Sequence, residues 1–225
     1  MIVKYVAQTV VWFGLMGGLL FLGAGTFAWP GAWAFLILMA CVSVAGGQAL
    51  SRLDPQLLKE RLGSPIQRDQ PMADKVLISL LLLGMLAWLL FMGLDAKRFA
   101  WSTVPAAVQV LGALTLLASI WFCFRVMLEN SFAAPVVKLQ KERGQRVIST
   151  GPYAFVRHPM YFGAAFYFIG TALLLGSLWG VALAFVLIGL LCVRIPIEER
   201  TLRAGLEGYD QYAAHVRFRL IPGVW

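Results

Sequence analysis

The chain has 225 residues and a formal net charge of +8; 60% of its residues are hydrophobic, 13% are charged, and its mean hydropathy is +0.77. Soluble globular domains carry about 25% charged residues, so this composition excludes an ordinary soluble domain and indicates an integral membrane protein. The basic residues are spread over three polar segments without a compact basic module, which argues against nucleic acid as a partner.

The apolar segments predict the transmembrane helices. Four of them are long enough to cross the hydrocarbon layer: residues 5–27, 32–50, 76–94 and 104–126. A further apolar run over 161–193 is broken at Gly176-Ser177 into halves of about 16 residues, which are short for full spans. We therefore expect an all-α polytopic helix bundle of five or six spans, one membrane domain with transmembrane helices in 1–126 and the chemically active region in 127–225.

The distribution of Lys and Arg predicts the orientation of the bundle. Of the 19 basic residues, all except Lys97 and Arg98 lie at the N-terminus, in 51–75, in 125–157 or after 193. The positive-inside rule then places both termini and both large loops in the cytoplasm. We expect a prokaryotic inner (cytoplasmic) membrane protein whose cationic segments contact anionic membrane lipids.

Small residues indicate how the helices pack. Gly14, Gly17, Gly18 and Gly23 line the first apolar segment and Gly46-Gly47 end the second, which predicts close helix packing. The three cysteines, Cys41, Cys123 and Cys192, have no metal-ligand spacing, so we expect small core hydrophobes and no metal site.

Two polar segments flank the predicted bundle at its cytoplasmic side. Residues 51–75 predict a short interfacial helix followed by an extended stretch. After Pro196, apolar residues recur at steps of three and four, which predicts an amphipathic helix: Leu202, Leu206, Tyr209, Ala213 and Val216. We expect this C-terminal helix to cap the cytoplasmic mouth of the bundle and to be followed by an extended tail.

A stiff polar loop precedes the hydrophobic hairpin. In Arg157-His158-Pro159, the proline disfavours helical backbone at His158 and starts a helix directly after it. Rigid loops at helix N-termini bind anions through free backbone N–H groups. The alternative is a rigid connector whose Arg and His only fix the membrane interface.

A second polar cluster follows the hairpin at Arg194, Glu198 and Glu199. On a helix, Arg194 and Glu198 would share a face and could pair, although Pro196 between them disturbs that register. The alternative is a helix end with a surface ion pair, which stabilises very little. We expect the two clusters to meet in space and to form one active site.

Taken together, these motifs resemble those of a known family. Gly-Pro-Tyr…Arg-His-Pro-x-Tyr, the hairpin, Arg-x-x-x-Glu-Glu-x-x-Leu and Tyr-x-x-Tyr…Val-x-Arg-x-x-Leu-Ile-Pro span Lys138 to Pro222. This order and spacing resembles the isoprenylcysteine carboxyl methyltransferase family of membrane enzymes, which is related to phospholipid N-methyltransferases and membrane thiol methyltransferases. The resemblance implies methyl transfer from S-adenosyl-L-methionine, at the cytoplasmic membrane face, to a lipophilic small-molecule or lipid-linked acceptor with a carboxylate or a thiol.

The resemblance also implies the site residues. The cofactor pocket would be formed by Gln145, Arg146, Val147, Ile148, Tyr153, His158, Pro159, Met160, Tyr161 and Glu198. Arg194 would face the acceptor and, with Glu198, carry the catalysis. Lys138 stands where the eukaryotic enzymes would have a neutral Gln.

The chemistry of the acceptor decides which groups are needed. A carboxylate is already ionised at neutral pH and needs no base, so Arg194 would hold it as a bidentate partner. A thiol or an amine must lose a proton, for which His158 and Glu199 are the candidates.

Two other function classes fit part of the pattern. A membrane sterol reductase shares the Arg-His-Pro-x-Tyr loop but uses NADPH, whose phosphate would favour more Arg or Lys than Glu near the pocket. A permease subunit would need polar or charged groups inside the spans, where we expect only scattered neutral side chains and no buried charge.

Overall fold

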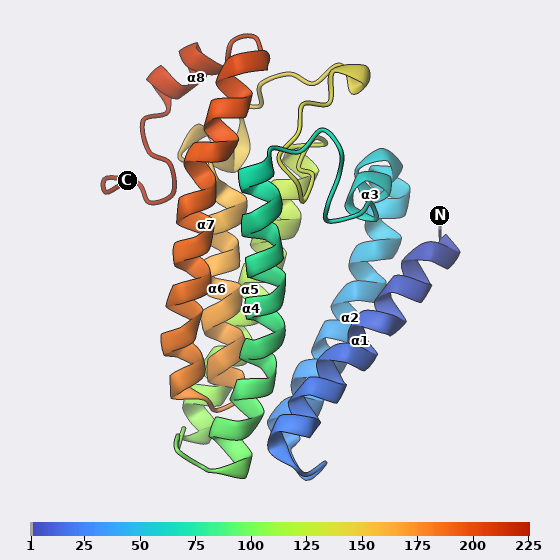
Figure 1. Cartoon of the computed structure of the whole chain (residues 1–225), viewed down its shortest axis with the longest axis vertical. Coiled ribbons are helices and arrows are strands. Elements are labelled where there is room, and N and C mark those ends of the chain that lie inside the picture. The colour runs from blue at the N-terminus through green and yellow to red at the C-terminus, as the bar shows by residue number, and fades with distance from the viewer. Residues whose placement is uncertain (1) are drawn as a thin grey trace.

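A computed structural model describes residues 2–225, which fold into an all-helical bundle without β-strands in this range. Six helices run along the long axis (Figure 1): α1 (Ile2–Ala24), α2 (Pro30–Leu53), α4 (Met72–Gly93), α5 (Ala106–Glu129), α6 (Pro159–Leu174) and α7 (Leu178–Gly205). Five of them are long and apolar enough to cross a membrane, whereas α6 is a shorter apolar helix. The predicted polytopic helix bundle is therefore confirmed.

Short helices complete the fold at the ends of the bundle. They are α3 (Pro55–Arg61), the π-helical turn η1 (Leu94–Arg98), the 3-10 turns η2 (Lys141–Arg143) and η3 (Gly151–Ala154), and α8 (Tyr209–His215). The carboxylate of Asp54 accepts from the backbone N–H of Leu57 at 2.9 Å and so caps α3. The short helix predicted within 51–75 is thus present.

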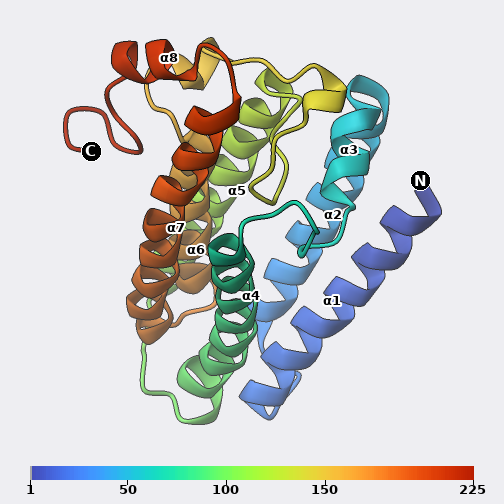
Figure 2. The ribbon, with the colours of Figure 1, turned by 45° about the horizontal axis from the view of Figure 1, so that its top comes forward.

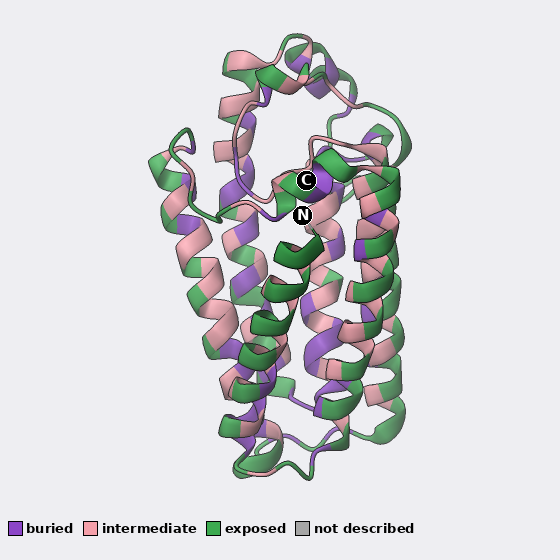
Figure 3. Cartoon of the chain, turned by 90° about the vertical axis from the view of Figure 1, so that its right-hand side faces the viewer, coloured by how far each residue is buried: buried purple, intermediate pink, exposed green. Residues whose placement is uncertain are grey.

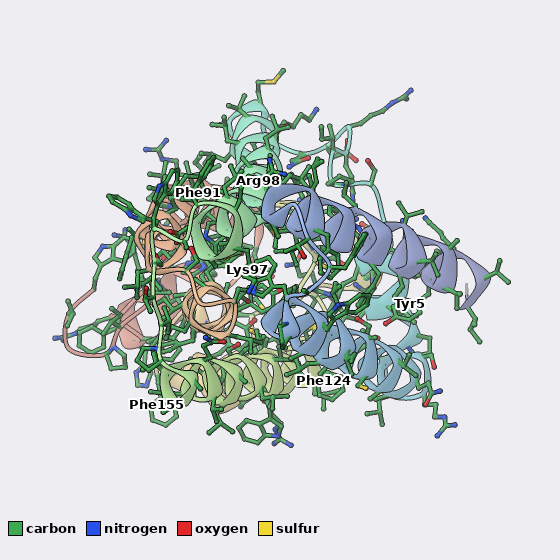
Figure 4. All side chains as sticks on the ribbon, turned by 90° about the horizontal axis from the view of Figure 1, so that it is seen from below. Tyr5, Phe91, Lys97, Arg98, Phe124 and Phe155 are labelled. Atoms are coloured by element: carbon green, nitrogen blue, oxygen red, sulfur yellow. The ribbon has the colours of Figure 1, made fainter. Side chains whose placement is uncertain are left out.

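Both termini, α3 and α8 lie at one end of the bundle, which we call the polar end (Figures 1 and 2). The opposite end carries the turns that join α1 to α2, η1 to α5 and α6 to α7. Figure 4 looks at that opposite end, where Lys97 and Arg98 are labelled. Most of the positive charge and both termini therefore share one end of the molecule.

Glycines permit the closest contacts between helices. A side chain at Gly170 would lie 2.6 Å from the backbone N of Leu116, so α6 and α5 touch through their backbones. Gly93 of α4 similarly allows α1 to approach closely, because a side chain at this position would lie 2.6 Å from the backbone N of Ala24. Gly14, Gly18 and Gly46, in contrast, face open space, so the close packing predicted for them is wrong. Much of α1 is exposed, as Figure 3 shows, and Gly14 and Gly18 lie on its exposed face, whereas Gly17 between them is buried and faces Leu36 of α2.

The C-terminal region differs from the predicted single amphipathic helix. α7 continues through Pro196 to Gly205, and a turn at Gly208, whose φ of 79° is left-handed, separates it from α8. The expected stripe still forms one apolar cluster, in which Leu202 of α7 and Leu206 directly after it pack with Tyr209 and Val216. Pro196 therefore does not end α7, and the left-handed Gly208 lies in the turn from which α8 begins.

The structure also contains buried charges that the sequence reading did not expect. Asp74 in the first turn of α4 and Asp95 in η1 are both fully buried, since the helix extends beyond the predicted 76–94 at each end. Asp95 accepts from Ser102 at 2.7 Å and from Ser177 at 2.5 Å, and so links two turns far from the polar end. Cys41 is exposed rather than in the core, whereas Cys123 and Cys192 are half-buried.

Candidate active site

A cavity of about 970 Å³ opens within the polar end of the bundle. Its walls come from α1, α2, α3, α5, α6, α7 and α8 and from the segment between α5 and η3, and its lining extends along α2 and α5 as far as Met39 and Leu117. All the residues proposed from the sequence for donor or acceptor binding line it: Gln145, Arg146, Val147, Ile148, Tyr153, His158, Pro159, Met160, Tyr161, Arg194 and Glu198. Segments that are distant in the sequence therefore converge on one hollow.

Arg157 fixes the loop that precedes α6. Its buried guanidinium donates through Nε to Glu199 at 2.7 Å and through Nη1 to the carbonyl oxygens of Val216 and Arg217 at 2.7 and 2.9 Å. The backbone N–H groups of Arg157 and His158 donate to the carbonyls of Phe218 and Arg219. The C-terminal tail thus lies against this loop, and Arg157 serves as the connector that the sequence reading gave as the alternative.

His158 joins the two polar clusters. As the residue before α6 it is non-helical, with φ −123° and ψ 58°, as Pro159 requires. Its Nε2 lies 3.3 Å from Oε1 of Glu199 and its Nδ1 lies 3.8 Å from Oε2 of Glu198. The ring stacks on Tyr161 with a centroid distance of 5.5 Å. The imidazole and the carboxylate of Glu198 both line the cavity and are therefore close enough to contact one small molecule.

The two glutamates occupy different positions. Glu198 faces the cavity and accepts from the hydroxyl of Tyr161 at 2.6 Å, and 29% of its side chain is exposed. Glu199 is buried behind the cavity wall, where Arg157, His158 and Arg219 surround its carboxylate. Glu199 does not line the cavity, so of the candidate bases it is poorly placed to take a proton from an acceptor.

Arg194 forms a buried ion pair with Asp74 of α4. Its Nε lies 2.6 Å from Oδ1 of Asp74, and its Nη2 donates to Oδ2 at 3.3 Å and to the carbonyl of Pro135 at 2.9 Å. Among residues 2–225, Nη1 makes no hydrogen bond, so it is the only free edge of the guanidinium. Sequence reading missed Asp74 because it lies 120 positions from Arg194, at the polar edge of an apolar run.

The tyrosines in and near α8 carry neutral, protonated hydroxyl groups. Burial raises the pKa of Tyr153. The side-chain amide of Asn130 donates to the hydroxyl of Tyr153 at 3.0 Å, and the hydroxyl of Tyr212 donates to its backbone carbonyl at 2.8 Å. Burial also raises the pKa of Tyr209, which lines the cavity. Its buried hydroxyl has no hydrogen-bond partner within residues 2–225, which is unusual for a buried polar atom.

Lys138 and Arg61 close the wall beneath α3. The Nζ of Lys138 lies 2.5 Å from Oε2 of Glu60, which accounts for a lysine where a neutral Gln was expected. Arg61 donates from Nη1 to the carbonyl of Ala133 at 3.0 Å and lines the cavity. No group of three or more potential metal ligands occurs among the described residues.

Comparison with known proteins points to the same half of the chain. The family model for phospholipid methyltransferase matches residues 107–206, which include all of α6 and α7 and all but the first residue of α5. Protein-S-isoprenylcysteine O-methyltransferase of Saccharomyces cerevisiae (strain ATCC 204508 / S288c) is 35% identical over 111 residues, which cover 48% of this chain and 46% of the yeast protein. The match thus spans about half the length of that relative. The resemblance to the isoprenylcysteine carboxyl methyltransferase family is confirmed for this part of the chain, and with five apolar helices the protein is integral to the membrane.

Proposed function

We propose that this protein is an S-adenosyl-L-methionine-dependent methyltransferase that acts at the cytoplasmic membrane face on a lipophilic acceptor with a carboxylate or a thiol. One observation supports this most strongly. The residues that the family resemblance assigns to the donor, from 145–148 to Glu198, all line one cavity in the part of the chain that matches methyltransferases.

The cavity fits such a donor in size and in chemistry. A volume of about 970 Å³ is at the upper end of the range for ligand pockets. Glu198 offers a carboxylate for ribose hydroxyls or an ammonium group. Tyr161 is less suited to a cationic sulfur, because Arg194 and His158 already lie against its ring. Tyr153 is the better aromatic candidate for that contact.

The residues of the chain would act mainly by positioning. The donor supplies an electrophilic methyl group on a sulfonium, so alignment and exclusion of water are the main requirements. The hydroxyl of Tyr161 donates to the carboxylate of Glu198 at 2.6 Å and so fixes its position. The hydrogen bond from Arg157 to the carbonyl of Val216 in the C-terminal tail fixes the loop that contains His158. This network keeps the polar wall rigid while the apolar wall between α2 and α5 receives the acceptor.

A carboxylate acceptor agrees best with the polar groups of the wall. It needs no base, and Glu199 is occupied by its three cationic or imidazole neighbours. Because Asp74 and Pro135 engage Nε and Nη2 of Arg194, this residue would donate from Nη1 alone rather than as a bidentate partner. For a thiol, His158 would be the proton acceptor.

A phospholipid amine is a second candidate acceptor, favoured by the description of the matching family model. Glu198 is the only acidic residue that lines the cavity, whereas five lining residues are Lys or Arg, which disfavours a cationic amine. Five Lys or Arg residues against one Glu is also the charge balance that the phosphate of NADPH would favour. The charge of the cavity therefore no longer argues against an NADPH-dependent reductase. Methyltransferase relatives favour the methyl-transfer proposal over the reductase.

The test is methyl transfer from labelled S-adenosyl-L-methionine to a panel of apolar carboxylates, thiols and amines, with protein in membranes. We expect Glu198→Gln to lower the rate at least tenfold, since a charge-assisted hydrogen bond contributes about 1.5–3 kcal/mol. The matched control is Glu142→Gln, an exposed residue away from the cavity. Thermal stabilisation by NADPH but not by S-adenosylhomocysteine would instead support the reductase and end the present proposal.

A further inference from the structure

Some of the cationic residues of the cavity wall pair with carboxylates and others do not. The lining Lys and Arg residues are Arg61, Lys138, Arg146, Arg157 and Arg194. Three of them pair with carboxylates that do not themselves line the cavity: Lys138 with Glu60, Arg157 with Glu199, and Arg194 with Asp74. Arg61 and Arg146 have no carboxylate within 4.0 Å among residues 2–225. The resemblance already gives Arg146 to the donor pocket, but nothing assigns a role to Arg61.

The position of Arg61 is fixed from two sides. It is the last residue of α3, whose Leu57 and Leu58 are buried against Leu50 of α2. Its neighbour Glu60 pairs with Lys138 at 2.5 Å, and Arg61 itself donates to the carbonyl of Ala133 at 3.0 Å. Both contacts reach the segment between α5 and η2, so the guanidinium is held at the cavity wall by polar contacts that leave its charge uncompensated.

Arg61 presents an exposed charge at the cavity wall. Its side chain is exposed and lines the hollow, and partial desolvation by the surrounding protein lowers the pKa of its guanidinium. The charge of Arg61 also reaches Tyr153. Burial is the main reason why the pKa of Tyr153 is raised; the negative charge of Glu198 raises it further, and the positive charge of Arg61 lowers it. An accessible guanidinium that lines the cavity without a carboxylate partner is available to pair with the anionic group of a ligand.

We propose that Arg61 is an anion-binding residue of this cavity and that it binds the carboxylate of a ligand. Guanidinium groups match carboxylates in geometry as well as in charge. That carboxylate belongs either to the amino-acid part of the methyl donor or to the acceptor. The inference rests on the proposed function, which places both ligands in this cavity.

The first arm of the test measures binding without turnover. Arg61→Gln keeps a side-chain donor for Ala133 but removes the charge, and Arg61→Lys restores the charge without the planar fork. The control is Lys59→Gln, an exposed cation on the same short helix that does not line the cavity. Affinities for S-adenosyl-L-methionine and for its decarboxylated analogue, which keeps the amine and the sulfonium, are compared in detergent. If the donor carboxylate is bound, Arg61→Gln weakens the first ligand roughly ten- to hundredfold and leaves the second unchanged.

The second arm measures the KM for a carboxylate acceptor and for its uncharged thiol counterpart. A roughly ten- to hundredfold rise for the carboxylate alone assigns Arg61 to the acceptor. Unchanged values in both arms, in a variant that unfolds at the same temperature as the unaltered protein, overturn the inference. Failure of the unaltered protein to bind S-adenosylhomocysteine and to transfer methyl would instead refute the proposed function itself.

Discussion

Asp74 is the residue that organises the polar wall of the cavity. Its carboxylate accepts from Gln70 at 2.6 Å, from the backbone N–H of Val137 at 3.0 Å and from Arg194 at 2.6 Å. These contacts join α4, α7 and the segment after α5 at one fully buried point. The orientation of Arg194, and therefore which of its nitrogen atoms faces the cavity, depends on Asp74.

This arrangement predicts a marked difference between single and double substitutions. Asp74→Ala leaves a buried, uncompensated guanidinium and should destabilise the protein by about 3–5 kcal/mol. The double variant Asp74→Leu with Arg194→Met removes both charges and should unfold at a higher temperature than Asp74→Ala. Thermal unfolding in detergent measures both. Equal losses in the two variants would show that the pair is not buried as described.

The site residues differ in how far the sequence could predict them. His158, Tyr161 and Glu198 stand in spaced motifs that resemble a family pattern, so they could be proposed together. Asp74 and Arg61 act through contacts with partners 120 and 72 positions away, and no local spacing signals such contacts. The neutralisation of three lining cations by carboxylates outside the cavity likewise required three-dimensional information.

At the scale of elements, the contact between α5 and α6 sets the position of the loop that precedes α6. Side chains at Gly112 and Gly170 would lie 2.5 Å from the N of Leu174 and 2.6 Å from the N of Leu116. Contacts this close fix the depth of α6 along α5. Because His158 directly precedes α6, the same contact fixes the imidazole relative to the carboxylates of α7.

We therefore predict that Gly170→Val destabilises the bundle. The added methyl groups would meet backbone atoms of α5, which cannot move aside, so the expected cost is about 1–3 kcal/mol or more. The control is Gly189→Val in α7, since nothing lies within 4 Å of a side chain there. The measurement is the thermal midpoint of purified protein in detergent. A similar midpoint for both variants would contradict the close approach of the two helices.

The boundaries of elements were predicted best where composition alone decides them. The four long apolar segments became α1, α2, α4 and α5; α2 is longer than predicted at both ends, whereas the other three helices are longer at one end and one to three residues shorter at the other. Pro196 was expected to disturb the helix, yet α7 continues through it, because neighbouring helices hold a proline-containing helix in place. The separate α8 depends on the left-handed backbone of Gly208, for which the apolar stripe gives no signal.

For the whole molecule, the six helices α1, α2, α4, α5, α6 and α7 run back and forth along the bundle, so both termini lie at the polar end, as Figure 1 shows. The same end carries nearly all the positive charge, since only Lys97 and Arg98 lie at the other end (Figure 4). A charge difference of this size is the main determinant of orientation during insertion. The cavity opens at the positive end, so orientation also decides on which side of the membrane the donor must be available.

This leads to a prediction about the intact membrane. In a variant without Cys41, Cys123 and Cys192, a cysteine is introduced by Lys97→Cys or by Arg68→Cys, both exposed positions at opposite ends. A membrane-impermeant maleimide added to intact cells should label the Lys97→Cys protein, whereas Arg68→Cys should react only after the membrane is opened, because the positive-inside rule predicts that the positive end faces the cytoplasm. The reverse pattern would place the cavity outside the cell, where a cytoplasmic donor such as S-adenosyl-L-methionine could not reach it, and the proposed reaction would then be untenable at this site.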